Sequence, residues 1–259
     1  MMKAPLHKQA FSLVELSIVL VILGLLTGGV LTGQSLIRAA ELRSVTTEFQ
    51  KYQTAVMTFR DKYFAIPGDM KNATDFWGEA NSTPATCIRT ESTDTKTCNG
   101  NGDGEIWLST ESYEPHRFWQ HLANAGLIEG SYTGTYGASA ADAILGVNVP
   151  QGKLSNGGWY IRTEQAAFSG SASFFDGDYG TRYIFGADGG TGNITQAAIL
   201  SPEEAWNIDT KVDDGKPGRG KVRVIYYTPC TLAVNETELD ANYELTNSDI
   251  ACALSFLVN

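Results

Sequence analysis

Apolar residues gather near the start of the chain, in an almost unbroken stretch from Leu16 to Leu31. With its flanks, this stretch reaches the roughly 20 residues that a membrane-spanning helix needs. Lys3 and Lys8 precede it, and lysines just before an apolar stretch hold that end of the chain in the cytoplasm. We therefore predict that residues 11–33 cross the membrane once. The rest of the chain should lie on the opposite side, because no other stretch is apolar enough to span.

The hydrophobic pattern changes after residue 33, where apolar residues recur at alternating spacings of four and three. Such spacing is typical of one apolar face on a helix, with the intervening charged residues in solvent. No proline occurs between Phe11 and Tyr63, so we predict that the same helix continues through residues 34–63. At about 1.5 Å per residue, the whole helix would span on the order of 80 Å. Its apolar face should pack on a globular head, and its members are Val45, Phe49, Tyr52, Val56, Phe59 and Tyr63.

Residues 64–259 are predicted to form that head, and the fold class expected for the whole is α+β: a long helix packed on an antiparallel sheet. Pro67 lies in a helix-ending IPGD sequence. Two short helices are expected, one over 113–128 and one beginning at the capping box of Ser201 and Glu204. Four segments rich in β-branched and aromatic residues are predicted strands, namely 157–164, 181–188, 221–228 and 251–258.

One acidic residue, Glu15, interrupts the apolar stretch near its beginning. A carboxylate inside a membrane costs about 2.5–3.5 kcal/mol on insertion scales, and less near the interface, so such a residue indicates a function. An ordinary secretory signal peptide places small residues after its apolar core, where it is cleaved. In this chain the small residue Ala10 comes before the core instead.

The segment KQAFSLVELSIVLVILGLL, residues 8–26, resembles the prepilin-type cleavage and methylation signal of type IV pilins and type II secretion pseudopilins. The resemblance implies that a prepilin peptidase cuts between Ala10 and Phe11 and methylates the new amino group of Phe11. It also implies that Glu15, the fifth residue after the cut, takes part in methylation and sets the register between assembled subunits. Glu15 would do so by pairing with the amine of a neighbouring subunit, because this pairing offsets the cost of an unpaired carboxylate. Ala10 replaces the family's usual glycine, and Thr32 stands where many major pilins carry proline, which favours a minor subunit.

The function implied by this resemblance is structural. The leader 1–10 would be removed, and the chain would then be a subunit of a type IV pilus or related filament, polymerised through its N-terminal helix. It would first lie in the bacterial inner membrane, N-terminus cytoplasmic and head periplasmic, and then in an extracellular or periplasmic filament. Expected partners are other pilin or pseudopilin subunits, prepilin peptidase and the inner-membrane assembly platform. Two alternatives stay open: a type II secretion pseudopilin, whose leader is alike, and a membrane-anchored periplasmic binding protein.

The net charge and the absence of known catalytic motifs argue against nucleic-acid binding and enzymatic activity. The formal net charge is −10, and an acidic surface repels phosphate, so nucleic acid is not an expected partner. The chain has no P-loop, GxSxG, HExxH or GxGxxG motif, and we predict neither catalytic residues nor enzymatic activity. His116 and His121 are five residues apart and do not share a helix face, so neither is expected to bind metal or act in catalysis.

The chain has four cysteines, none of them in a CxxC pair, which argues against a zinc ribbon or a thioredoxin-type site. An even number suits an oxidising compartment if the head is exported. Because the first two and the last two lie close in sequence, we predict two local disulfides, Cys87–Cys98 and Cys230–Cys252. Four free buried thiols are the alternative.

Calcium is the only cofactor that the sequence suggests. Asn99, Asn101, Asp103 and Glu105 alternate with glycines, and oxygen ligands at alternate positions can wrap one hard cation. The alternative is an Asn/Gly turn clamped by the first disulfide. A second candidate set, Asp209, Asp213 and Asp214, precedes a glycine, and the alternative there is a surface turn capped by Asp213.

Overall fold

A computed structural model describes residues 13–258 apart from 88, 93, 108–112, 138, 140 and 165–166. One long helix, α1, runs from Leu13 to Tyr63, so the predicted continuation of the apolar segment into an amphipathic one is confirmed. The chain divides into two compact units, Met1–Glu41 and Leu42–Asn259, and α1 contributes residues to both. The second unit is the head.

Within the first unit, the large apolar side chains of α1 are exposed. Leu13, Val21 and Leu26, for example, expose 85%, 62% and 59% of their surface. By length and composition this helix could cross a membrane, and its most apolar window has no buried residue. These side chains contribute nothing to the core of the head.

Within the head, the apolar face of α1 is buried as predicted, and it forms the centre of the core. Phe49 packs against Phe256, with ring centroids 4.8 Å apart. Tyr52 contacts Trp119 and Trp159 at 4.9 and 5.5 Å, in edge-to-face geometry. Such aromatic pairs stabilise a core by about 0.5–1.5 kcal/mol beyond the area that they bury.

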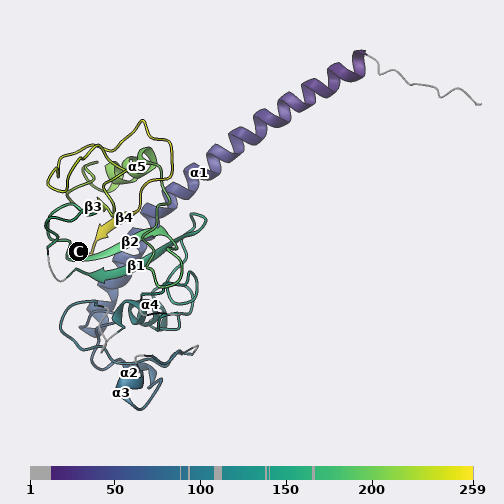
Figure 1. Ribbon diagram of the computed structural model, residues 1–259. Helices are drawn as coiled ribbons and strands as arrows, with labels where there is room; N and C mark the ends of the chain where they lie inside the picture. Colours follow the sequence, from purple (N-terminus) through teal and green to yellow (C-terminus); the bar gives the residue numbers. More distant parts are fainter. Residues whose placement is uncertain are drawn as a thin grey trace, which may run out of the picture. The chain divides into compact units, whose positions relative to one another are not determined.

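The sheet has four strands, β1 (Gly157–Thr163), β2 (Thr181–Ala187), β3 (Val222–Val224) and β4 (Leu254–Leu257), in the order β1-β2-β4-β3. All neighbouring strands are antiparallel, and Figure 1 shows them crossing the part of α1 that lies in the head. The third predicted strand, 221–228, is shorter than expected. After β3 the chain leaves the ladder, because the N–H of Tyr227 donates to the carbonyl of Ser173 at 3.1 Å.

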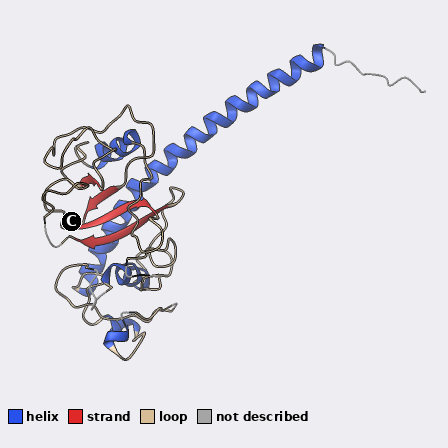
Figure 2. Ribbon diagram, viewed as in Figure 1, coloured by secondary structure: helices blue, strands red, loops and turns tan. Residues whose placement is uncertain are grey.

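Four short helices complete the described head: α2 (Ala73–Trp77), α3 (Pro84–Cys87), α4 (Glu114–Asn124) and α5 (Pro202–Val212). The last two are the two predicted helices, and α5 begins at the predicted capping box. The first two were not predicted, since they are only five and four residues long. Contacts place α4 against β1 and α5 against β3, and Figure 2 shows how much of the remaining head is loop.

Candidate functional site: the N-terminal motif and the head loops

Glu15 lies in the first turn of α1, among exposed apolar side chains. Ala10 and Phe11, the residues of the predicted cleavage, lie outside the described residues. The motif therefore presents one carboxylate at the beginning of a helix whose surrounding surface is apolar. A negative charge near a helix N-terminus is favoured by the helix dipole.

The hydroxyl groups in the apolar part of α1 bond within the helix. Thr27 donates to the carbonyl of Leu23 at 2.9 Å, and Thr32 donates to that of Gly28 at 2.9 Å. Ser17 and Ser35 donate in the same way to carbonyls three residues earlier. In a membrane each polar group must find a partner inside the protein, and these four hydroxyls do so without leaving the helix. The helix is continuous through Thr32.

Both predicted disulfides are present in the head. Cys87 and Cys98 are bonded, with Cα atoms 5.8 Å apart, and Cys230 and Cys252 are bonded with Cα atoms 5.2 Å apart. The second bridge joins the loop that contains Cys230 to Cys252, and Cys252 pairs with Leu200 in an isolated β-bridge. The head thus has the covalent cross-links that an oxidising compartment permits.

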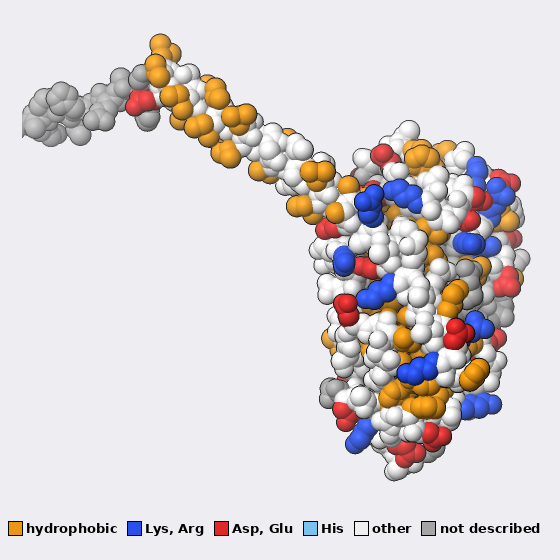
Figure 3. Space-filling view, turned by 180° about the vertical axis from the view of Figure 1, so that it is seen from behind, with side chains coloured by type: hydrophobic (Ala, Val, Ile, Leu, Met, Phe, Trp, Pro, Cys, Tyr) orange, Lys and Arg blue, Asp and Glu red, His pale blue; other side chains and the backbone are white. Residues whose placement is uncertain are grey.

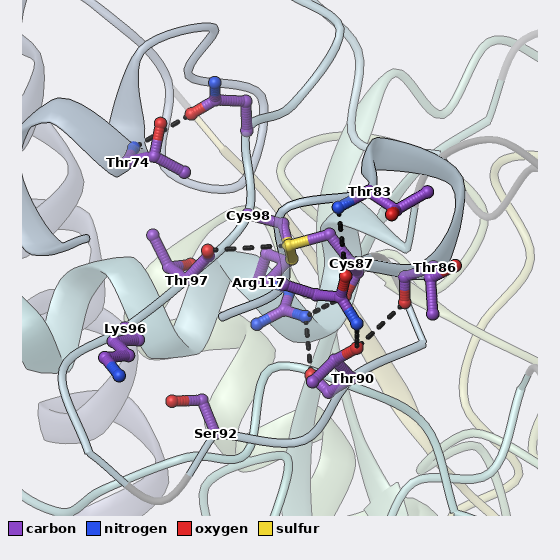
Figure 4. The surroundings of a disulfide bond; sticks show 12 residues. Thr74, Thr83, Thr86, Cys87, Thr90, Ser92, Lys96, Thr97, Cys98 and Arg117 are labelled. Atoms are coloured by element: carbon purple, nitrogen blue, oxygen red, sulfur yellow. Dashed lines mark hydrogen bonds between the residues drawn. A yellow bond between two sulfur atoms is a disulfide. The ribbon is translucent and has the colours of Figure 1, made fainter. Parts of the chain in front are cut away.

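The first disulfide is held by a buried arginine of α4 (Figure 4). One Nη of Arg117 donates to the carbonyls of Cys87 and Thr90, both at 2.9 Å, and the other donates to Oε1 of Gln120 at 2.8 Å. Arg117 exposes only 3% of its surface, and this burial lowers the pKa of its guanidinium to about 10. A charged group so buried is tolerated only where hydrogen bonds replace its hydration, and here the two loop carbonyls and Gln120 do so for the Nη atoms.

The same network reaches the end of α1 through His121. The N–H of Gly68 donates to Nδ1 of His121 at 2.9 Å, so Nε2 carries the ring proton and faces the Thr97 hydroxyl at 2.9 Å. That hydroxyl donates in turn to Gln120 at 2.7 Å. Burial lowers the pKa of His121 to about 3, so the ring stays neutral at ordinary pH. The histidine therefore has a structural role, holding the IPGD turn against α4.

The Asn/Gly loop folds around two acidic residues, Asp69 and Glu114, that do not belong to its local sequence pattern. The carboxylate of Asp69 accepts backbone N–H groups from Gly102, Asp103 and Gly104. Glu114 accepts the N–H of Asn101 at 3.2 Å. The carboxylates of Asp69, Asp103 and Glu114 approach within 4.8 Å of one another, because the loop brings Asp103 onto the start of α4.

The predicted calcium ligands of this loop divide into two groups. Asp103 joins the acidic cluster, whereas Asn99 accepts the N–H of Thr74 at 2.9 Å. Asn101 accepts the N–H of Asp103 at 3.0 Å and thereby forms a local turn. Glu105 is not among the clustered carboxylates of the described residues. Any cation here would be held by residues distant in sequence, which local spacing does not reveal.

Burial changes the acidity of this cluster. Glu114 exposes 1% of its surface, and burial raises the pKa of its carboxyl to about 7. Burial also raises the pKa of Asp69, although the N–H groups of Gly104 and Gly102 act in the opposite direction. Among the described residues, no Lys or Arg forms an ion pair with Asp69, Asp103 or Glu114. The repulsion between these carboxylates is therefore not offset by a neighbouring cation.

The second predicted set, Asp209, Asp213 and Asp214, does come together at the end of α5, with carboxylates within 4.8 Å. Each has other partners. Asp209 accepts the hydroxyl of Tyr243 at 2.8 Å, and burial raises its pKa to about 7. Asp213 accepts the N–H of Lys221, and Asp214 lies 3.4 Å from the guanidinium of Arg219. This arrangement serves the turn after α5.

A hollow of about 210 Å³ lies beside β1. The side chain of Arg162 in its lining forms an ion pair with Glu164 at 2.7 Å and covers the ring of Trp107 at 5.3 Å. Its described lining is apolar or aromatic apart from that arginine and consists of Trp107, Ala141, Tyr160, Arg162 and Ile194.

Comparison with known proteins bears on the N-terminus alone. Residues 6–31 match the family model of the prokaryotic N-terminal methylation motif. No curated protein and no solved structure matches the chain. The matched residues include Ala10, Phe11 and Glu15, and the motif is the signal that prepilin peptidase processes. The chain carries the N-terminal methylation signal of type IV pilins and pseudopilins, on a pilin-like α+β layout.

Proposed function

We propose that this chain is a minor subunit of a type IV pilus or a related filament. The observation that carries the proposal is the methylation motif at residues 6–31, placed on a helix whose apolar side chains from Leu13 to Ile37 are exposed. Exposed apolar patches much larger than a few hundred Å² mark interaction or membrane surfaces. The large head and Thr32 in the place of the proline support a minor rather than a major role.

In this proposal the helix first anchors the chain in the inner membrane, with the head in the periplasm. After cleavage between Ala10 and Phe11, the helix leaves the lipid and packs among the helices of other subunits. Glu15 then pairs with the amine of a neighbouring subunit. A wrong axial register would strand that carboxylate in an apolar bundle, which is costly.

The test is the variant Glu15→Ala in the full chain, examined in cells that assemble the filament. We expect it to insert in the membrane as the wild type does and to be recovered at least tenfold less in sheared filaments. Glu41→Ala is the matched control, because Glu41 lies on the same helix and forms an ion pair with Arg38 at 3.5 Å. Wild-type recovery of Glu15→Ala in filaments would contradict the role of this carboxylate.

A pseudopilin of type II secretion carries the same signal, so location decides between the two. A minor pilin should be found in filaments sheared from the cell surface, together with a major subunit. A pseudopilin should stay in the periplasm, and its deletion should stop the export of folded proteins. Recovery of Met1 or Met2 on the mature chain, by mass spectrometry, would contradict both.

Calcium binding stays a prediction and is part of the proposal only as a stabiliser of the loop near Asp103. The test compares the melting midpoint of the head with and without 1 mM calcium. A rise in the midpoint that disappears in Asp103→Asn would support a site, and an unchanged midpoint would contradict one.

A further inference from the structure

The hollow beside β1 lies on the face of the sheet that is turned away from α1. Trp159 of β1 contacts Tyr52 of α1, with ring centroids 5.5 Å apart. Because successive side chains of a strand point to opposite faces, Tyr160 and Arg162 point to the other face, where both line the hollow. A ligand here would therefore be bound by the head, at a place separate from the apolar part of α1.

The size of the hollow suits a small molecule. One water needs about 10–15 Å³ of cavity volume, and the hollow offers about 210 Å³. Pockets for drug-sized ligands measure about 300–1,000 Å³, so the occupant has to be smaller than these ligands. Three of the described lining residues are apolar or aromatic, namely Trp107, Ala141 and Ile194. They provide a surface on which an apolar ring can pack.

Tyr160 brings to the hollow a hydroxyl group whose hydrogen-bonding capacity is unused. Tyr160 exposes 1% of its surface, and its hydroxyl forms no hydrogen bond to a described residue. A buried polar group without a partner is costly, so in a native protein such a group calls for an explanation, for example a bound water or ion. Burial raises the pKa of Tyr160, although the nearby charge of Arg162 acts in the opposite direction. The hydroxyl therefore keeps its proton and can donate it.

Arg162 places a cationic donor beside the same hollow. One Nη of Arg162 donates to Oε2 of Glu164 at 2.7 Å, and this is the only hydrogen bond that a described residue accepts from the guanidinium. The guanidinium has five N–H donors, and 30% of the side chain is exposed. The remaining N–H groups of Arg162 can therefore bind a ligand.

The surroundings of the hollow do not attract an anion by themselves. The net charge of the chain is −10, and acidic and basic side chains are interspersed over the face of the head that Figure 3 shows. A carboxylate would gain little from the field of the whole protein, so local donors have to hold it. Glu164 already offers one carboxylate to Arg162. The site thus accommodates this group, and Glu164 would compete with a ligand that carries it.

We propose that this hollow binds a small organic acid, a carboxylate attached to a flat apolar ring. Arg162 and the hydroxyl of Tyr160 would donate to the carboxylate oxygens, and hydrogen bonds to an anionic acceptor are stronger than neutral ones. The ring would pack against Trp107, Ala141 and Ile194. A largely apolar lining with a few polar groups that fix the orientation is what small-molecule sites share. The inference goes beyond the proposed function and does not rest on it, because all five residues belong to the head.

Benzoate is the probe, because it joins a carboxylate to one flat ring. We expect the full-length chain in detergent micelles to bind benzoate saturably, as measured by ligand-observed NMR. Benzamide lacks the charge and acetate lacks the ring, so each should bind roughly tenfold more weakly than benzoate. Arg162→Gln should weaken benzoate binding by a similar factor. Arg219→Gln is the matched control, because Arg219 also pairs with an acid, Asp240 at 2.8 Å, but does not line the hollow.

Two further variants test the separate parts of the site. Tyr160→Phe should weaken benzoate binding severalfold and leave the melting midpoint unchanged or higher, because the hydroxyl has no described partner to lose. Glu164→Gln should bind benzoate more tightly than the wild type, since the neutral amide competes less for Arg162. An unchanged or weaker affinity of Glu164→Gln would contradict Arg162 as the partner of the carboxylate.

Three results would overturn the inference: no saturable binding of benzoate to the wild type, equal binding of benzoate and benzamide, or equal affinity of the wild type and Arg162→Gln. A higher melting midpoint of Tyr160→Phe without benzoate binding to the wild type would assign the hydroxyl to a bound water and overturn it as well. None of these results bears on filament assembly, which the recovery of Glu15→Ala in sheared filaments tests separately.

Discussion

The two parts of α1 place similar apolar side chains in opposite environments. Up to Glu41 the large apolar residues are exposed, as Ile22 at 49% and Leu26 at 59% illustrate. Beyond Leu42, Val45 and Phe59 are completely buried in the head. A single helix therefore completes one hydrophobic core within the molecule and offers a second apolar surface to a membrane or to other molecules. The difference shows that the residues of this helix that stabilise the head are separate from those that form its exposed apolar surface.

The largest effect on the stability of the head should come from Phe49→Ala, which alters the buried part of α1. Phe49 exposes 3% of its surface and contacts the ring of Phe256 at 4.8 Å. Its truncation removes apolar contacts and leaves a cavity, which typically costs 3–5 kcal/mol. We expect the free energy of unfolding of the head to fall by about 4 kcal/mol, measured by denaturant unfolding.

Leu26→Ala is the matched control, since Leu26 is on the same helix but exposed. It should leave the unfolding of the head unchanged within about 0.5 kcal/mol and affect membrane insertion or assembly instead. A loss of head stability as large as that of Phe49→Ala would show that the two parts of the helix are not independent.

The buried part of α1 also contains a polar residue, Glu48, whose hydrogen bonds should contribute to the stability of the head. Glu48 exposes 9% of its surface and accepts the indole N–H of Trp159 at 2.7 Å and the backbone N–H of Lys153 at 2.9 Å. Glu48→Ala would leave both donors without this acceptor, and each unsatisfied buried donor costs about 1–3 kcal/mol. We expect a loss of about 2–3 kcal/mol in the free energy of unfolding.

Glu48→Gln keeps only one of the two acceptor oxygens, so it should retain one of the two hydrogen bonds and cost about half as much. If the two variants lost equal stability, the fold would require both oxygens as acceptors, and one hydrogen bond alone would not stabilise the site. Glu48 thus accepts hydrogen bonds from residues outside α1, whereas the hydroxyls of Ser17 and Thr32 donate to carbonyls of the same helix.

Much of this arrangement could be predicted from the sequence because it follows from periodic patterns. The spacing of apolar residues in 45–63 indicated the buried helix face, and alternating β-branched and aromatic residues indicated the strands. The capping box of Ser201 and Glu204 placed the start of α5 correctly. Such local signals suffice where neighbours in sequence are also neighbours in the element.

The acidic cluster could not be predicted in the same way. Its three members, Asp69, Asp103 and Glu114, come from separate segments that meet only in the folded head. Spacing along the loop suggests Asp103 together with Asn99, Asn101 and Glu105, because a local pattern cannot show that Asp69 and Glu114 approach the loop. The hydrogen-bond partner of His121 could not be predicted for the same reason, because Gly68 lies 53 residues away.

A smaller and pH-dependent effect is expected at His116, which is completely buried in α4. Burial lowers the pKa of His116 to about 3, although the backbone of Asp142 acts in the opposite direction. Below pH 6.5 the unfolded chain takes up a proton at this site, whereas the folded chain does not until about pH 3. The free energy of unfolding therefore falls as the pH drops through this window, by about 1.4 kcal/mol at pH 5.5.

His116→Leu removes that contribution. The variant should resemble the wild type in melting midpoint at pH 8 and exceed it increasingly from pH 6.5 downward. Parallel curves for the two proteins would show that His116 is protonated in the folded head. Leu26→Ala should follow the wild type at every pH, because its side chain takes no part in the core.

The smallest effect is expected just after the last residue of α1, where an apolar side chain is exposed although it belongs to the head. Phe64 exposes 93% of its surface and has a φ of 53°, in the left-handed region that costs a residue with a side chain about 1–2 kcal/mol. Phe64→Gly removes this strain but gives the unfolded chain more freedom, so we expect a net gain of about 0.5–1 kcal/mol. Phe64→Ala keeps the strain and should give no gain. If Phe64→Gly lost stability, the exposed ring would contribute to the core after all, and the division of α1 into buried and exposed apolar surfaces would not extend to its end.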